Sequence, residues 1–124
     1  MAGVCIIEWI IKGQGGHGSE PALSIDPITA AVEVHQSLHT IKARRILNKD
    51  VLAFTICHME AGTADAVIPD EAYMQGSIRY FDKSVKEKVF ADIKRISTNV
   101  AEAHGCKCEL KIHDMYPPVI NHEK

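Results

Sequence analysis

A glycine-rich stretch, residues 13–21, carries the first side chain that could do chemistry. It holds four glycines, one serine, one proline and a single histidine, His17. Glycine costs backbone entropy in a regular element and proline lacks a donor, so we expect neither a helix nor a central strand there. Such a loop can hold an imidazole in the open. Because the ordinary pKa of imidazole lies nearest to neutrality, His17 could transfer a proton or donate to a developing negative charge.

Arg79 is the second side chain that could act on a small molecule. Its guanidinium could bind a carboxylate through two parallel hydrogen bonds. Together, His17 and Arg79 could stabilise an oxyanion and hold a carboxylate, but no reaction centre lies between them. The residues alone also allow an idle His17 in a flexible loop and an Arg79 in a surface ion pair. Ser19, two residues after His17, is poorly arranged as a nucleophile beside a base.

Length and composition predict a single domain over residues 1–124. The chain is 46% hydrophobic and 24% charged, with a formal net charge of -2. Nucleic acid is therefore not expected as a partner, since no basic stripe appears. No apolar run approaches the roughly 20 residues that span a bilayer, and no signal peptide is visible, so we expect a cytoplasmic protein without a membrane partner. The four cysteines lack metal-site spacing; Cys106 and Cys108 are expected as small core residues, and buried free thiols fit a reducing compartment. The four cysteines are Cys5, Cys57, Cys106 and Cys108.

Hydrophobic periodicity predicts six elements that must position these side chains. We expect a cap from Asp26 on the first helix, a capping box that begins at Ser84 on the second, and a left-handed terminus at Gly105. Charged positions on the second helix, among them Lys86 and Asp92, are expected in solvent. The expected elements are a strand over 4–12, a helix over 26–47, strands over 51–59 and 71–81, a helix over 84–104 and a strand over 106–114.

This order predicts an α+β fold of the ferredoxin-like βαββαβ type, a four-stranded antiparallel sheet with two helices on one face. Right-handed crossovers would place the first and third strands in the centre. Arg79 then points away from the helices, because Ile78 and its alternating neighbours form the core face. In the last strand, the inward residues would be Cys106, Cys108, Leu110 and Ile112.

One flank of the first helix combines apolar residues with two histidines. These residues are Ile28, Val32, His35 and His39. His35 and His39 are four apart, a spacing that could bind zinc, but no glutamate follows His35 and no third ligand is evident. We therefore expect half-exposed side chains and no metal. Such a flank could form a helix–helix contact between subunits.

Five motifs occur in an order and spacing that resemble one known family. They are residues 15–21, 26–28, 62–64 with 67–70, 76–79, and 117–119 followed by Asn121. Together they resemble the lid, or dimerisation, domain of the zinc aminoacylase and carboxypeptidase family of metallohydrolases. The hippurate hydrolase and auxin-conjugate amidohydrolase branch is the most similar. The resemblance covers nearly the whole chain.

The resemblance implies that this chain is a lid inserted into a catalytic domain, with residues 116–124 as the linker back to it. Zinc, or another divalent metal, and the general-base glutamate would belong to that domain. His17 would reach the active site of the partner subunit and stabilise the tetrahedral intermediate. Arg79 would bind the carboxylate of a small substrate, with Gly62 and Thr63 nearby.

Two further expectations complete this interpretation. The resemblance implies homodimers that join through the first helix and an edge strand, which agrees with the apolar flank described above. The family usually has an asparagine where this chain has Ala66, which bears on the substrate range. We expect the full enzyme to hydrolyse N-acyl amino acids or related amides, and this segment to be inactive alone. The alternative is a free-standing ferredoxin-like module that binds a small ligand or dimerises for regulation.

Overall fold

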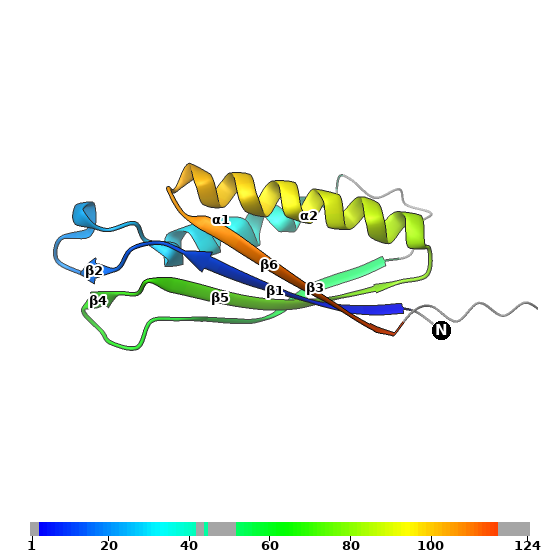
Figure 1. The fold of residues 1–124 in the computed structure, drawn as a ribbon, viewed down its shortest axis with the longest axis horizontal. Helices are drawn as coiled ribbons and strands as arrows, with labels where there is room; N and C mark the ends of the chain where they lie inside the picture. The colour runs from blue at the N-terminus through cyan, green and yellow to red at the C-terminus, as the bar shows by residue number, and fades with distance from the viewer. Residues whose placement is uncertain (1–2, 42–43, 45–51, 117–124) are drawn as a thin grey trace, which may run out of the picture.

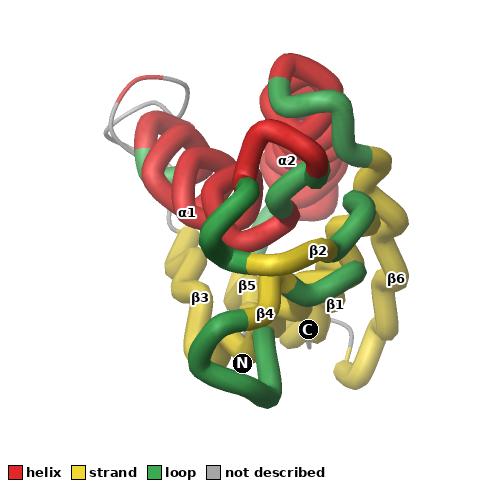
Figure 2. The backbone as a smooth tube through the Cα atoms, turned by 90° about the vertical axis from the view of Figure 1, so that its left-hand side faces the viewer, coloured by secondary structure: helices red, strands yellow, loops and turns green. Residues whose placement is uncertain are grey.

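The computed structural model describes residues 3–41, 44 and 52–116 of the chain. Its main body has two layers, a four-stranded antiparallel sheet and two helices that cover one face of that sheet (Figure 1, Figure 2). The sheet contains β1 (Gly3–Lys12), β3 (Leu52–Ala61), β5 (Glu71–Tyr80) and β6 (Lys107–Tyr116), and the helices are α1 (Pro27–Leu38) and α2 (Lys83–Ala103). The predicted α+β, ferredoxin-like βαββαβ fold is confirmed.

The strand order in the sheet is β3-β5-β1-β6. The central pair, β1 and β5, is in continuous register from Gly3 opposite Tyr80 to Lys12 opposite Glu71. Viewed end-on, α1 lies over the β3 side of the sheet and α2 over the β6 side (Figure 2). As predicted, the first and third strands of the main sheet are central, so each edge strand lies beside a different helix.

The structure confirms some of the predicted helix ends and contradicts one. Asp26 caps α1 as predicted, because its carboxylate accepts a hydrogen bond from the Ile28 amide at 2.8 Å. The expected end of this helix near Leu47 lies outside the described residues. The predicted capping box on α2 is wrong: Asp82 is the cap, and its carboxylate accepts hydrogen bonds from both the amide and the hydroxyl of Ser84. Gly105 has a φ of 79°, which confirms the left-handed terminus.

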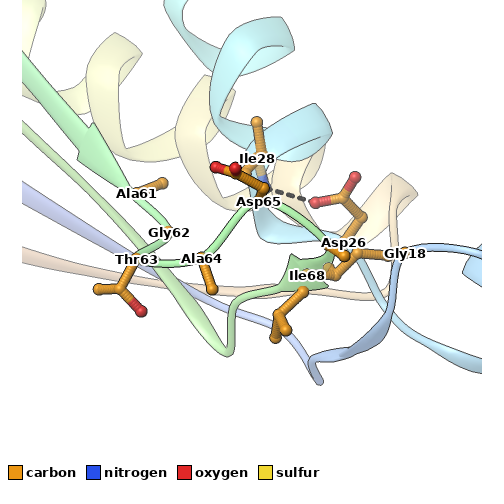
Figure 3. Close-up of a pocket in the computed structure, with 11 residues that line it drawn as sticks. Gly18, Asp26, Ile28, Ala61, Gly62, Thr63, Ala64, Asp65 and Ile68 are labelled. Carbon is orange, nitrogen blue, oxygen red and sulfur yellow. Dashed lines mark hydrogen bonds between the residues drawn. The ribbon is translucent and has the colours of Figure 1, made fainter.

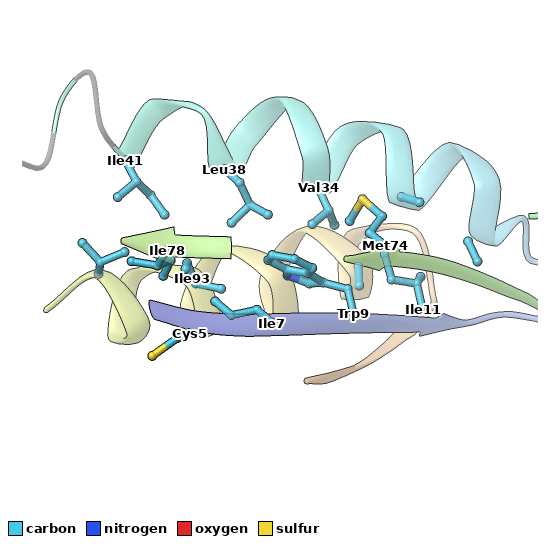
Figure 4. Packing of buried hydrophobic residues seen from close by; sticks show 14 of the residues in the cluster. Cys5, Ile7, Trp9, Ile11, Val34, Leu38, Ile41, Met74, Ile78 and Ile93 are labelled. Carbon is cyan, nitrogen blue, oxygen red and sulfur yellow. The ribbon is translucent and has the colours of Figure 1, made fainter. Parts of the chain in front are cut away.

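The core lies between the sheet and the helices (Figure 4). Trp9 is fully buried at its centre, and its indole N–H donates to Ser97 Oγ on α2 at 2.9 Å. This bond joins the central strand to the covering helix. The side chains predicted to face the core from the first strand and the first helix are all buried; they comprise Cys5, Ile7, Trp9 and Ile11 with Ala31, Val34, Leu38 and Ile41, the last of which lies beyond the end of α1.

Two predictions about polar positions on α2 are wrong. Lys86 is buried because its ammonium lies 3.5 Å from Asp114 and over the ring of Tyr80, at the end of the sheet. Asp92 is buried as well, and it accepts a hydrogen bond from Arg95 at 2.9 Å. Both side chains therefore belong to the buried side of α2 and not to its solvent-facing side.

The last strand is less covered than expected. Cys106 is buried and Cys108 and Leu110 are partly buried, but Ile112 is exposed. Ile112 pairs with Ile7 and shares its face. The predicted face is therefore right, and the exposure arises because β6 is an edge strand at the margin of α2.

Candidate functional site at the tip of the sheet

A second, two-stranded sheet forms at one tip of the molecule (Figure 1). Strand β2 (Gly16–His17) pairs with β4 (Val67–Ile68), so His17 lies opposite Val67. The Gly18 amide extends the pairing with a 2.7 Å hydrogen bond to the Ala66 carbonyl. His17 is therefore held beside Ala66, from the 62–70 connection. The sequence did not predict this pairing, because two-residue strands leave no periodic pattern.

Asp70 fixes the start of the glycine-rich loop. Its carbonyl accepts a hydrogen bond from the Gly13 amide, and its carboxylate accepts one from the Gly15 amide, both at 2.8 Å. A Cβ atom at Gly15 would lie 2.2 Å from the carbonyl oxygen of Ile68, which no real side chain tolerates. Glycine is thus required at this position so that the two segments can approach closely.

His17 is exposed, and its ring orientation is set by Ser19. The Ser19 amide donates to His17 Nδ1 at 3.1 Å, and the Ser19 hydroxyl lies 2.6 Å from the same nitrogen. A backbone N–H can only donate, so Nδ1 is an acceptor and the neutral ring carries its proton on Nε2. Nε2–H is then the donor that remains for a ligand. Ser19, poorly arranged as a nucleophile, is instead a positioning residue for His17.

A hollow of about 490 Å³ lies beside this tip, between the 61–68 segment and the start of α1 (Figure 3). Gly18 forms part of its wall, next to His17 in the chain. Gly62 and Thr63, predicted to contact substrate, also line it, as does Ala66. Asp26 belongs to the same wall, but its carboxylate is engaged by the α1 amide and by Thr29. The structure therefore places Gly62, Thr63 and Ala66 beside the tip that carries His17.

Arg79 lies near the other end of the sheet. It is exposed on the face opposite the helices, as predicted. It follows Glu71 by eight residues along β5, which corresponds to about 27 Å of extended strand. Because Glu71 pairs with Lys12 just before the glycine-rich loop, His17 lies beyond that distance. The structure does not bring His17 and Arg79 together within one chain.

The predicted dimer flank forms an exposed strip beside the β3 edge. Ile28, Val32 and His39 are exposed and His35 is half-buried, with the two imidazole rings 4.7 Å apart. Burial, and the neighbouring His39, lower the pKa of His35. Met59 of β3 joins the strip, and it lines a hollow of about 230 Å³ with Val32 and His35. The strip thus continues from the helix onto the edge strand.

The free edges of β3 and β6 differ in charge. From Leu52 to Met59, β3 has no lysine, arginine, aspartate or glutamate. Strand β6 carries Lys107, Glu109, Lys111 and Asp114. Charged side chains on an edge strand discourage pairing with another chain. The β3 edge is therefore the one suited to a partner strand.

Other site features concern metals and thiols. Across residues 3–41, 44 and 52–116, no group of three or more histidine, cysteine, aspartate or glutamate side chains is placed to hold a metal ion. Burial raises the pKa of the Cys5 and Cys108 thiols to about 11, whereas Cys57 is exposed. Neither described helix combines the length and hydropathy of a membrane-spanning segment.

Several curated proteins are similar to this chain in sequence. Thermostable carboxypeptidase 1 of Saccharolobus solfataricus is 37% identical over 90% of this chain and 29% of its own length. N-acetylcysteine deacetylase of Bacillus subtilis is 36% identical over 98% of this chain and 32% of its own. An Arabidopsis thaliana IAA-amino acid hydrolase is 28% identical over 99% and 28%, respectively. The chain thus spans about a third of the length of these relatives.

Solved structures agree with the sequence relatives. An aminohydrolase from Staphylococcus aureus has a TM-score of 0.91 at 28% identity, over 97% of this chain and 32% of that protein. A dinuclear metal-binding peptidase from Bacillus subtilis has a TM-score of 0.75 at 30% identity, over 98% and 28%. A family model described as a peptidase dimerisation domain matches residues 2–105. By fold, sequence and relatives, this chain belongs to the peptidase dimerisation domain family.

Proposed function

We propose that this chain is the lid and dimerisation domain of a metal-dependent amidohydrolase that cleaves N-acyl amino acids or related amides. The single observation that carries the proposal is the hydrogen bonding of His17, which leaves its Nε2–H as a free donor. Its Nδ1 is occupied by Ser19, so Nε2–H remains available at an exposed tip. A donor in this state suits the negative charge that develops on a carbonyl oxygen during amide hydrolysis. Relatives named as a deacetylase and a carboxypeptidase support that reaction class.

The metal and the general base of this reaction would lie in a catalytic domain of the same protein. The described residues do not fit a metal ion, so no step of the reaction is assigned to a metal bound here. A divalent metal remains part of the proposal for the full enzyme, since one similar structure is a dinuclear metal-binding peptidase. We assign the full enzyme to the cytoplasm.

The separation of His17 from Arg79 supports a site shared between two subunits. A small N-acyl amino acid has its carboxylate only a few bonds from its amide, whereas the two side chains lie more than about 27 Å apart in one chain. One substrate could therefore not contact both side chains of the same chain. In the proposed homodimer, each active site receives Arg79 from its own chain and His17 from the partner subunit.

The dimer would form through the flank of α1 and the free edge of β3. The strip of Ile28, Val32, His35 and His39 is continuous with Met59, and the β3 edge lacks charged residues up to Met59. Antiparallel pairing of two β3 strands would satisfy their free backbone groups and cover this apolar strip. Such an arrangement leaves the two tips that carry His17 free to reach other sites.

Gly62 and Thr63 are proposed to contact substrate from the wall of the hollow next to the His17 tip. Ala66 lies directly beside that tip, since its carbonyl binds the Gly18 amide. A methyl side chain there cannot donate a hydrogen bond. In this enzyme His17 Nε2–H is then the principal donor that this lid offers to the oxyanion.

Mixed dimers test the proposal. In the full-length protein, His17→Ala and Arg79→Ala are each expected to lower the hydrolysis of N-acetyl-L-methionine, the first by about 10²-fold or more. Mixing the two variants should restore about one quarter of the wild-type activity, because half of the dimers then contain one intact site. No recovery on mixing, with dimers shown to exchange, would mean that both residues act within one chain. An unsubstituted protein that hydrolyses no N-acyl amino acid would refute the proposed reaction.

A further inference from the structure

The open face of the sheet carries an apolar row at the end where Arg79 lies. Arg79 on β5 pairs with Val4 on β1 and with Ala53 on β3. Residues paired across neighbouring strands point to the same face, so two apolar side chains flank the guanidinium. Within the described part of the chain, no acidic side chain forms an ion pair with Arg79. The guanidinium is therefore an available cation in an apolar row.

Met115 extends this row onto β6. The pairing of β1 with β6 shifts between Val4 and Cys5, so Met115 is the extra residue of a bulge. The neighbouring Asp114 points to the helix side, because it accepts a hydrogen bond from the buried Cys5 thiol at 2.6 Å. A bulge sets two residues of one strand opposite a single residue of its neighbour, here Met115 and Tyr116 opposite Val4, so Met115 lies beside the open-face row, and its side chain is 51% exposed. Two strand spacings place it about 10 Å across the sheet from Arg79.

Phe81 adds a second large apolar side chain at the same end. It follows Tyr80, whose side chain is buried on the helix side. Phe81 lies in the bend directly after β5, two residues after Arg79, and its side chain is 53% exposed. A phenyl ring and a thioether are thus exposed at the same end of the sheet as a guanidinium that forms no ion pair with the residues the structure describes.

We infer that Phe81 and Met115 select substrates whose amino-acid side chain is apolar. This inference rests on the proposed function, in which Arg79 binds the substrate carboxylate. The amino-acid side chain is attached one carbon from that carboxylate, so it lies within reach of the surface around the guanidinium. Val4 forms the centre of that surface, and Phe81 and Met115 form its sides. A charged or very small side chain would leave these residues in water.

The test is the ratio of kcat/KM for N-acetyl-L-leucine to that for N-acetylglycine in the full-length enzyme. The double variant Phe81→Ser, Met115→Ser is expected to lower this ratio about tenfold, the effect of losing half-buried apolar contacts. Arg79 is unchanged, so hydrolysis of N-acetylglycine should persist. Because both side chains are more than half exposed, the thermal midpoint of the variant should stay near that of the wild type.

Ile112→Ser is the matched control. Ile112 lies on the same strand as Met115, is 44% exposed and faces the helix side. It should leave the leucine-to-glycine ratio unchanged. A double variant whose ratio stays within about twofold of wild type, or a control that shifts the ratio equally, would overturn the assignment. If the unsubstituted enzyme hydrolyses neither amide, the proposed function itself fails, and the inference falls with it.

Discussion

Ser19→Ala is expected to lower kcat of the full-length enzyme about fivefold without a comparable change in KM. The substitution removes the hydroxyl that lies 2.6 Å from His17 Nδ1 but keeps the backbone amide at 3.1 Å. One hydrogen bond of this kind is worth about 1 kcal/mol net, and about 1.4 kcal/mol corresponds to a tenfold change in rate. The imidazole would keep its tautomer and lose part of its orientation. His17→Ala, by contrast, removes the donor itself and should cost about 10²-fold to 10³-fold.

The assay is steady-state hydrolysis of N-acetyl-L-methionine by four variants. Ser19→Thr keeps a hydroxyl and should restore most of the rate. Ser24→Ala is the control, because its hydroxyl donates to the Pro21 carbonyl in the same loop and does not touch His17. If Ser19→Ala and Ser24→Ala both match the wild type, Ser19 does not position His17. If Ser19→Ala is as slow as His17→Ala, the loop itself has collapsed and the hydrogen-bond argument is wrong.

Three further predictions concern the chain on its own. Ser97→Ala should lower the free energy of unfolding by about 1–3 kcal/mol, because the Trp9 indole N–H loses its buried acceptor. Denaturant unfolding followed by the fluorescence of the single tryptophan measures this loss, and an unchanged denaturant midpoint would contradict the prediction. Cys57 should be the first thiol alkylated by iodoacetamide in dilute samples and should become protected as concentration rises; equal labelling at all concentrations would exclude pairing at β3. The pKa of His35 is lowered in the folded chain, so as the pH falls below about 6.5 the imidazole is protonated in the unfolded chain first, and the free energy of unfolding should decline. His35→Gln should reduce this decline. A variant whose stability has the same pH dependence as the wild type would show that His35 does not cause it.

The fold was predictable because, in most helices and strands, the hydrophobic periodicity of the sequence matches the face that is buried in the structure. The alternation of β1 buries Cys5 to Ile11 on one face, and the same residues fill the core in the structure. The start of α1 was predictable because Asp26 is a favoured helix cap and Pro27 is favoured at the first helical position that follows it. The α2 cap did not follow, because Asp82 and Ser84 are both strong capping residues two positions apart. Only backbone geometry decides which of them stands outside the helix.

The burial of two charged residues on α2 could not be predicted from the sequence, for a different reason. Lys86 and Asp92 satisfy the helical pattern for solvent-facing residues, yet both are buried. The partner of Lys86 is Asp114, which comes from the last strand and lies 3.5 Å away. Its ammonium lies over the rings of Tyr80 and Phe90 and also reaches this carboxylate and the Tyr80 hydroxyl. Such pairs depend on contacts between distant segments, which periodicity does not encode.

The candidate site shows most clearly what a single sequence leaves open. The residue types of His17 and Arg79 indicated an oxyanion donor and a carboxylate ligand, but their relation in space depends on strand register. Once Lys12 pairs with Glu71 and Val4 with Arg79, the two side chains must lie at opposite ends of the sheet. No loop movement within the described lid can close a gap of about 27 Å, because β5 is a single central strand between them. If both side chains serve hydrolysis of one small amide, a second lid must supply one of them, and the dimer is then a requirement of the chemistry.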